Sequence, residues 1–244
     1  MLNILAEYVL PYIIIIGIVV HQNEKLTKKE QVVQAQIMAK LGVAHIKLMS
    51  PQPTIIAMVG LVGSGKSSVA DLLAGHISAL VVKGDTIRTA LRREGERYER
   101  TRAIAENIAL EVVKHSSNVI LDSDFIDRKK RASIREKARK AGVRLVFIRT
   151  HCDFDVMLER ICTNDSGEFF NNASSLSKAP DKGKYIKMRE LDRRKPHHYR
   201  WLNQGGGKWI PKKLPFSIYC DIDTTNRISW TRHVELCAEK LFPR

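Results

Sequence analysis

The stretch from Gly60 to Ser67 reads GLVGSGKS and fits the spacing G-x-x-x-x-G-K-[ST]. It follows an apolar run and opens a helical stretch, so its glycines allow the backbone to turn N–H groups inward around an anion. The N-terminus of that helix would add free N–H groups and the positive end of its dipole. We expect Lys66 to reach the β- and γ-phosphates of a nucleoside triphosphate and the Ser67 hydroxyl to ligate Mg²⁺. The expected phosphate-binding residues are Gly60, Val62, Gly63, Ser64, Gly65, Lys66, Ser67 and Ser68.

A carboxylate and a guanidinium follow the next apolar run. Asp85 comes soon after residues 79–83, and Arg88 would point to a similar side if a helix starts at Thr86. Ligands of open parallel sheets bind at the carboxyl ends of the strands. A carboxylate there can accept the proton of an attacking hydroxyl, and a guanidinium can hold a substrate phosphate or orient the carboxylate. The alternative for Asp85 is an ordinary helix N-cap.

Two aspartates follow a third apolar run, NVIL at 118–121. Asp122 has a Walker-B-like position, from which a carboxylate could hold the Mg²⁺ shell through water. Asp124 lies two residues later and is either a rival or a second contributor. One of the two could instead cap the next helix. The sequence therefore predicts a metal site built from Ser67, Asp122 and Asp124.

These candidate residues require a scaffold that brings strand ends together. Strands separated by helical stretches predict an α/β fold with a five-stranded parallel sheet and helices on both faces. Short apolar strands such as TIIAMV suit burial on both faces. The expected strands are 55–59, 79–83, 118–122, 143–150 and 215–223, and the expected helices are 66–78, one from 86, one closing at 107–117, 129–141, 153–162 and 229–241.

The charge of the chain favours anionic partners. Its 244 residues include 41 Lys and Arg against 26 Asp and Glu, a net charge of +15. Residues 178–213 alone hold 12 basic and 3 acidic side chains, within a long segment, 164–213, that we interpret as a lid. Arg189 and Arg193 lie one helical turn apart and are the expected lid contacts to the migrating phosphoryl group, unless this helix is merely a solvated basic surface. The HHYRW stretch at 197–201 could stack a base or pack the lid on the body.

The N-terminal part divides into two further segments. Residues 1–22 are mostly apolar, and 2–20 form a candidate membrane anchor of borderline length; a helix packed on the domain and an edge strand are the alternatives. Lysines after this segment would keep the main domain on the cytoplasmic side. Residues 23–53 are expected to form a helical linker before a domain at 54–244. The four cysteines lack CxxC spacing, which indicates reduced thiols and a cytoplasmic protein.

With these residues identified, the chain resembles P-loop kinases of the adenylate-kinase-like group, particularly its small-molecule and polynucleotide kinase branch with zeta-toxin-like proteins. The likeness is carried by GLVGSGKSS, KGDTIRTALR, NVILDSDFIDRKKRASIREKARKAGVRLVFIRT and DFDVMLERI, and covers about residues 54–163. It implies ATP, Mg²⁺ and a hydroxyl acceptor, with Asp85 as the base and Arg88 as the acceptor contact of a D-x-x-R motif. CDIDTTN at 220–226 looks like the adenine-side loop of such kinases, which places Thr225 near the nucleotide.

Two hypotheses of different classes follow. The first is a kinase that transfers the γ-phosphoryl group of ATP to a hydroxyl. The second is a nucleotide-dependent switch that binds nucleic acid or a membrane, which the basic surface and the apolar N-terminus favour. The Asp85–Arg88 pair favours the kinase, because a switch needs no acceptor base. A polynucleotide 5′-hydroxyl suits the charge best, while a nucleotide, an amino sugar or another metabolite stays open as the acceptor.

Overall fold

A parallel sheet forms the centre of the computed structural model, which describes residues 25–46, 50–163 and 183–243. The strand order is β2-β3-β1-β4-β7, and all four pairings are parallel. The strands are β1 (Thr54–Val59), β2 (Ala79–Lys83), β3 (Asn118–Asp122), β4 (Arg144–His151) and β7 (Cys220–Asp223). The predicted five-stranded parallel sheet is confirmed.

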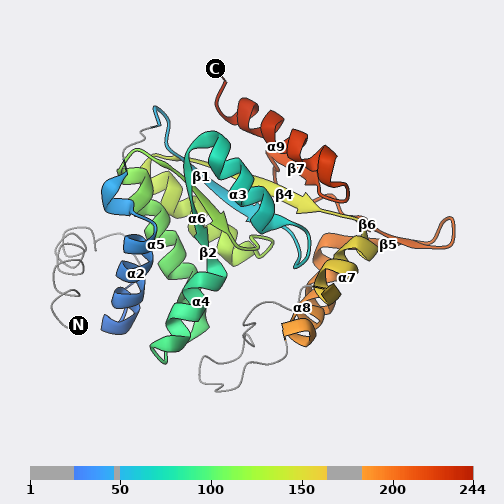
Figure 1. Ribbon diagram of the computed structural model, residues 1–244, viewed down its shortest axis with the longest axis horizontal. Coiled ribbons are helices and arrows are strands. Elements are labelled where there is room, and N and C mark those ends of the chain that lie inside the picture. Colours follow the sequence, from blue (N-terminus) through green and yellow to red (C-terminus); the bar gives the residue numbers. More distant parts are fainter. Residues whose placement is uncertain (1–24, 47–49, 164–182, 244) are drawn as a thin grey trace.

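Helices cover both faces of the sheet (Figure 1). They are α2 (Lys28–Lys40), α3 (Lys66–Ile77), α4 (Gly84–Arg93), α5 (Thr101–Lys114), α6 (Arg128–Ala141), α7 (Phe154–Thr163), α8 (Gly183–His198) and α9 (Arg227–Leu241), with short 3₁₀ helices at Val43–His45 and Tyr98–Arg100. Alternate side chains of β1 serve two cores. Ile55 packs with residues of α2, α5 and α6, whereas Ile56 packs with residues of α3 and α9. Because every residue of β1 is buried, this strand reads as a continuous apolar run.

The first described helix is part of this core. Thr27 and Glu30 form a capping box at the N-terminus of α2. Val33, Ile37 and Met38 of α2 are buried in the same cluster as Ile55. The segment 23–53, expected to be a linker, therefore contributes a helix that packs on the domain.

Other boundaries also differ from the sequence-based expectation. Helix α4 begins at Gly84 instead of Thr86, with Lys83 in the N-cap position, so Asp85 lies in the first turn and is not the N-cap. Strand β7 covers only Cys220–Asp223 of the expected 215–223. The preceding Phe216 leaves the sheet edge, where the Arg131 guanidinium lies 3.8 Å from its ring centroid.

An antiparallel hairpin follows α8 and was not predicted. Strands β5 (Tyr199–Leu202) and β6 (Lys208–Pro211) pair with each other, and they extend away from the main sheet (Figure 1). Trp201, half exposed, packs edge-on against Trp209 at a centroid distance of 5.3 Å. The HHYRW stretch thus forms the end of α8 and the first strand of this hairpin.

The expected N-terminal helix and membrane anchor at residues 2–20, and the first part of the expected lid, lie outside the described residues. In the ranges that are described, no helix combines the length and apolarity needed to cross a bilayer.

Candidate active site

The phosphate loop, residues 60–67, connects β1 to α3 and depends on its glycines. Gly63 and Gly65 have φ values of +79° and +80°, in the left-handed region that favours glycine. Gly60 is excluded from carrying a side chain for a different reason: an added Cβ would lie 2.5 Å from Thr150 Oγ1. The loop backbone therefore requires glycine at all three positions.

Two side chains of the loop have different environments. Ser64 is fully buried, and its hydroxyl donates to the Leu61 carbonyl oxygen at 2.7 Å and lies 2.9 Å from Thr150 Oγ1. Ser64 supports the loop, and its hydroxyl faces away from the cavity. Lys66 lines the cavity, and its Nζ donates to the Leu61 carbonyl oxygen at 2.8 Å. This cation lies over the loop, where a polyphosphate would take the place of the carbonyl as its partner.

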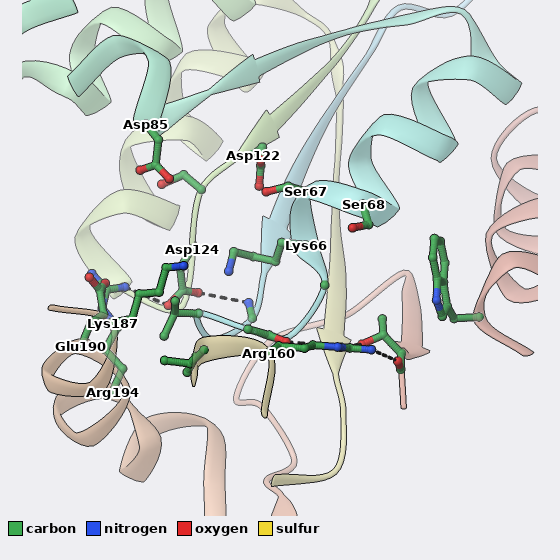
Figure 2. Close-up of a pocket in the computed structure, with 18 of the residues that line it drawn as sticks. Lys66, Ser67, Ser68, Asp85, Asp122, Asp124, Arg160, Lys187, Glu190 and Arg194 are labelled. Carbon is green, nitrogen blue, oxygen red and sulfur yellow. Dashed lines mark hydrogen bonds and ion pairs between the residues drawn. The ribbon is translucent and has the colours of Figure 1, made fainter. Parts of the chain in front are cut away.

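Asp122 lies at the carboxyl end of β3, beside β2 and close to Ser67 of α3 (Figure 2). Burial raises the pKa of Asp122 above its ordinary value and Asp85 acts in the same direction, although Lys66 and a hydrogen bond from Ser67 oppose both. A buried carboxylate beside a hydroxyl suits a divalent cation, which would compensate its charge. Ser67 and Asp122 therefore fit a Mg²⁺ site.

That fit does not extend to the third predicted ligand, Asp124. Its Oδ1 accepts hydrogen bonds from the amides of Gly60 at 3.3 Å and Ile126 at 3.1 Å. Its Oδ2 lies 2.8 Å from Arg194 Nη1 and 3.2 Å from His198 Nε2. Burial alone would raise the pKa of Asp124, but the His198 hydrogen bond and the charges of His198, Lys66 and Arg194 hold it well below its ordinary value.

Asp124 thus connects the phosphate loop to α8, and both its oxygens already have partners. The interpretation of Asp124 as a metal ligand is corrected to a structural role. Within the described ranges, no group of three or more His, Cys, Asp or Glu residues converges as a metal site. Mg²⁺ bound through few protein ligands and substrate phosphates is consistent with that finding.

Asp85 and Arg88 lie on α4 at one side of the cavity, and Asp85 is visible there in Figure 2. Arg88 Nη1 forms an ion pair and hydrogen bond with Asp85 Oδ1. The Asp85 side chain is 75% exposed, while that of Arg88 is 26% exposed. The guanidinium therefore orients a carboxylate that is open to a ligand entering the cavity, as the sequence predicted for the pair.

Helix α8 supplies different cavity residues from those expected. Arg189 and Arg193 are exposed and are not among the residues that line the cavity. Lys187, Glu190 and Arg194 line it instead, and Figure 2 shows them together on α8. The correct helix was identified, but the helical phase selected the wrong face.

The opposite side of the cavity is closed by contacts that the sequence analysis missed. Arg160 of α7 donates to the carbonyl oxygens of Gly63 at 3.3 Å and Thr224 at 2.6 Å, and to Thr224 Oγ1 at 3.0 Å. Thr224, Arg227 and Trp230 line the cavity, whereas the predicted Thr225 does not. Thr225 Oγ1 instead accepts from the Asp153 amide at 2.9 Å and bonds Asp223 at 2.6 Å. The motif at 220–226 indicated this loop, one residue away from the side chain that faces inward.

Lys130, on the first turn of α6, is a further cavity residue that was assigned to the surface. Its Nζ donates to the Asp124 carbonyl oxygen at 3.5 Å. Burial lowers the pKa of Lys130 to about 8, and the positive charges of Arg194 and Arg88 act in the same direction. No local pattern separates it from the adjacent lysine, because the stretch 128–131 is wholly basic.

These elements enclose one cavity of about 750 Å³. Figure 2 shows Lys66 near its centre, with Asp85 and Arg194 on one side and Arg160 on the other. The side with Asp85, Arg88, Lys130 and Arg194 is called the acceptor side below. Its companion, lined by Arg160, Thr224, Arg227 and Trp230, is called the α9 side.

Comparisons with known proteins agree with this architecture. Residues 55–163 match the family model described as an AAA domain. No curated protein sequence matches the chain. The solved structure of APE1195 is 18% identical, covers 80% of this chain and 98% of its own, and has a TM-score of 0.52. A protein from Chloroflexus aurantiacus j-10-fl, named as a proposed kinase, is 17% identical with coverages of 79% and 98% and a TM-score of 0.50.

A gluconokinase from Sinorhizobium meliloti 1021 is 17% identical, with coverages of 80% and 95% and a TM-score of 0.48. At these identities the likeness establishes the fold and nothing finer. The resemblance to P-loop kinases identified from the motifs is confirmed at that level.

Proposed function

Starting from a chain with the P-loop kinase-like fold, we propose that it is an ATP-dependent phosphotransferase that moves the γ-phosphoryl group of Mg-ATP to a hydroxyl acceptor. The observation that supports this most is the single cavity shared by Lys66 of the phosphate loop and the Asp85–Arg88 pair. A phosphate site alone would serve any nucleotide-binding protein. A carboxylate beside it, oriented by a guanidinium, is the additional group that transfer to an alcohol requires.

Each residue has a defined part in this proposal. Lys66 and the loop amides bind the β- and γ-phosphates, and Asp85 takes the proton of the attacking hydroxyl. Ser67 and Asp122 would hold Mg²⁺, which when bound neutralises charge on the phosphates. Arg194 is the α8 arginine that lines the cavity, and we assign to it the lid role expected of Arg189 and Arg193. Catalysis of this kind consists mainly of positioning and electrostatic stabilisation.

Substitution of Asp85 tests the assignment of the base. We expect Asp85→Asn to lower turnover by about 100-fold or more, which is the usual contribution of a general base. ATP affinity should stay close to that of the wild type, because Asp85 lies away from the phosphate loop. The measurement is transfer of label from γ-labelled ATP to 5′-hydroxyl oligonucleotides, nucleotides, amino sugars and other hydroxylated metabolites.

Asp71→Asn is the matched control for this experiment. Asp71 is an exposed aspartate of α3 that pairs with Lys83 at 2.8 Å and does not line the cavity. Its turnover should equal that of the wild type. Full activity of Asp85→Asn would refute the assignment of the base. Release of phosphate without transfer to any acceptor, stimulated by RNA or a membrane surface, would instead support the nucleotide-dependent switch.

A further inference from the structure

We propose that Arg88, Lys130 and Arg194 form an anion-binding subsite, and that the phosphoryl acceptor carries its own oxyanion, a phosphate, sulfate or carboxylate. This inference rests on the proposed phosphotransferase function, and it concerns the acceptor side of the same cavity. It names the group that recognises the acceptor, which the phosphate loop and Asp85 do not define.

The first support is the convergence of cations from three separate elements. Arg88 comes from α4, Lys130 from α6 and Arg194 from α8, and all three line the cavity. Arg194 and Arg88 are both close enough to Lys130 to lower its pKa. Three cations from distant segments of the chain rarely meet without a counter-charge, because like charges disfavour each other at short range.

The second support is that their carboxylate partners do not balance this convergence. Arg88 is paired with Asp85, and Arg194 with Asp124 at 2.8 Å and Glu190 at 2.9 Å. Lys130 forms no ion pair within 4.0 Å among the described residues; its recorded bond is the 3.5 Å contact with a backbone carbonyl. A largely buried ammonium group whose nearest polar partner is neutral is poorly compensated.

An incoming oxyanion would supply the missing charge. It would accept charge-assisted hydrogen bonds from the Lys130 ammonium and from guanidinium N–H groups that the carboxylates do not occupy. Because Arg88 also pairs with Asp85, an acceptor held by these cations would have its hydroxyl near the proposed base. The subsite would therefore select and orient the acceptor in the same contact.

The test measures anion binding in protein whose phosphate loop is already filled. The full chain is saturated with a non-hydrolysable ATP analogue and Mg²⁺, and inorganic phosphate is titrated by calorimetry at pH 7. We expect Lys130→Met to weaken phosphate binding about tenfold or more, the usual loss for one charge-assisted hydrogen bond. Lys130→Arg should largely retain the affinity, because it keeps the charge.

Lys129→Met is the matched control, since Lys129 is the exposed neighbour on the same helix and does not line the cavity. Its phosphate affinity should be that of the wild type, and all three variants should bind the analogue normally. Unchanged phosphate affinity in Lys130→Met, or no phosphate binding to the analogue-loaded wild type, would overturn the subsite. Failure of the analogue itself to bind would instead refute the nucleotide site on which the proposed function rests.

Competition then distinguishes the source of the oxyanion. Glycerol 3-phosphate and a short 5′-hydroxyl oligonucleotide are each added to the phosphate-bound, analogue-loaded protein. Displacement by glycerol 3-phosphate assigns the subsite to a small phosphorylated alcohol, and displacement by the oligonucleotide alone assigns it to the end of a nucleic acid. If neither displaces phosphate, the subsite does not recognise the acceptor and the inference fails.

Discussion

The carboxylate of Asp124 offers the most direct test of how this site is held together. It accepts two backbone amides, those of Gly60 and Ile126, and contacts Arg194 and His198 of α8. The substitution Asp124→Asn keeps the shape and one carbonyl oxygen, so the bonds to the two amides can survive. Its neutral amide cannot pair with Arg194, and it leaves that guanidinium without its contact to the loop.

The size of the effect follows from the burial of this pair. Asp124 and Arg194 side chains are only 10% and 18% exposed. Removal of one partner from a buried ion pair costs about 3–5 kcal/mol. Because Arg194 also keeps Glu190 at 2.9 Å, we expect a loss near the lower limit, roughly 3 kcal/mol in the free energy of unfolding at pH 7.

The loss should also depend on pH in a defined direction. The pKa of Asp124 is lowered by folding, so the unfolded chain takes up the proton first as the pH falls. The stability that the carboxylate contributes is complete above the unfolded pKa of about 3.9 and declines below it. The difference between wild type and Asp124→Asn should therefore shrink by about 1 kcal/mol between pH 7 and pH 3.

Urea unfolding followed by circular dichroism at the two pH values measures both quantities. Asp192→Asn is the control, because Asp192 is exposed on α8 and pairs only with Lys195 at 3.5 Å in the described structure. Its free energy of unfolding should stay within about 0.5 kcal/mol of the wild type. A similarly small effect for Asp124→Asn, or a large effect that is the same at both pH values, would refute the buried ion pair.

Three other substitutions have expected outcomes. Lys66→Ala should abolish nearly all transfer from γ-labelled ATP, and substantial residual turnover would contradict its place on the phosphates. Asp122→Asn should raise the Mg²⁺ concentration for half-maximal activity by about tenfold or more, which a magnesium titration measures; an unchanged requirement would exclude Asp122 from the metal shell. Gly60→Ala should cost about 1–3 kcal/mol in urea unfolding, since its Cβ would lie 2.5 Å from Thr150 Oγ1, while Gly75→Ala, with no atom within 4 Å, should be stabilising by about 0.5–1 kcal/mol. Equal effects of the two glycine substitutions would contradict the close packing under the loop.

Local patterns were sufficient for the central sheet and the phosphate loop. The spacing from Gly60 to Ser67 dictates a strand, a tight turn and a helix, so the geometry of that segment depends on nearby residues only. The same is true of Asp122, because an apolar run ending in an aspartate places the carboxylate at the edge of the sheet.

Contacts between distant segments could not be obtained in this way. Asp124 meets Arg194 and Arg160 meets Thr224 across 70 and 64 positions of the chain, and nothing near any of these residues specifies its partner. Lys130 is buried only because α4 and α8 pack near α6, so its sequence neighbourhood reads as a solvated surface.

The errors on α8 and the hairpin have local causes. Basic side chains occupy both faces of α8, and periodicity could not show whether Arg193 or Arg194 faces inward. Between 199 and 211 two short strands flank a run of three glycines, and the aromatic residues in them suggested a stacking surface before a β-hairpin.

The two networks around the phosphate loop have a consequence for the energetics of ligand capture. Asp124 fixes the first glycine amide from one flank, and Arg160 grips the Gly63 carbonyl from the other. The loop is consequently rigid before any nucleotide arrives, so little conformational entropy is lost on association. Amide protons of this turn should already exchange slowly in the empty protein, and saturation with nucleotide should slow them only modestly.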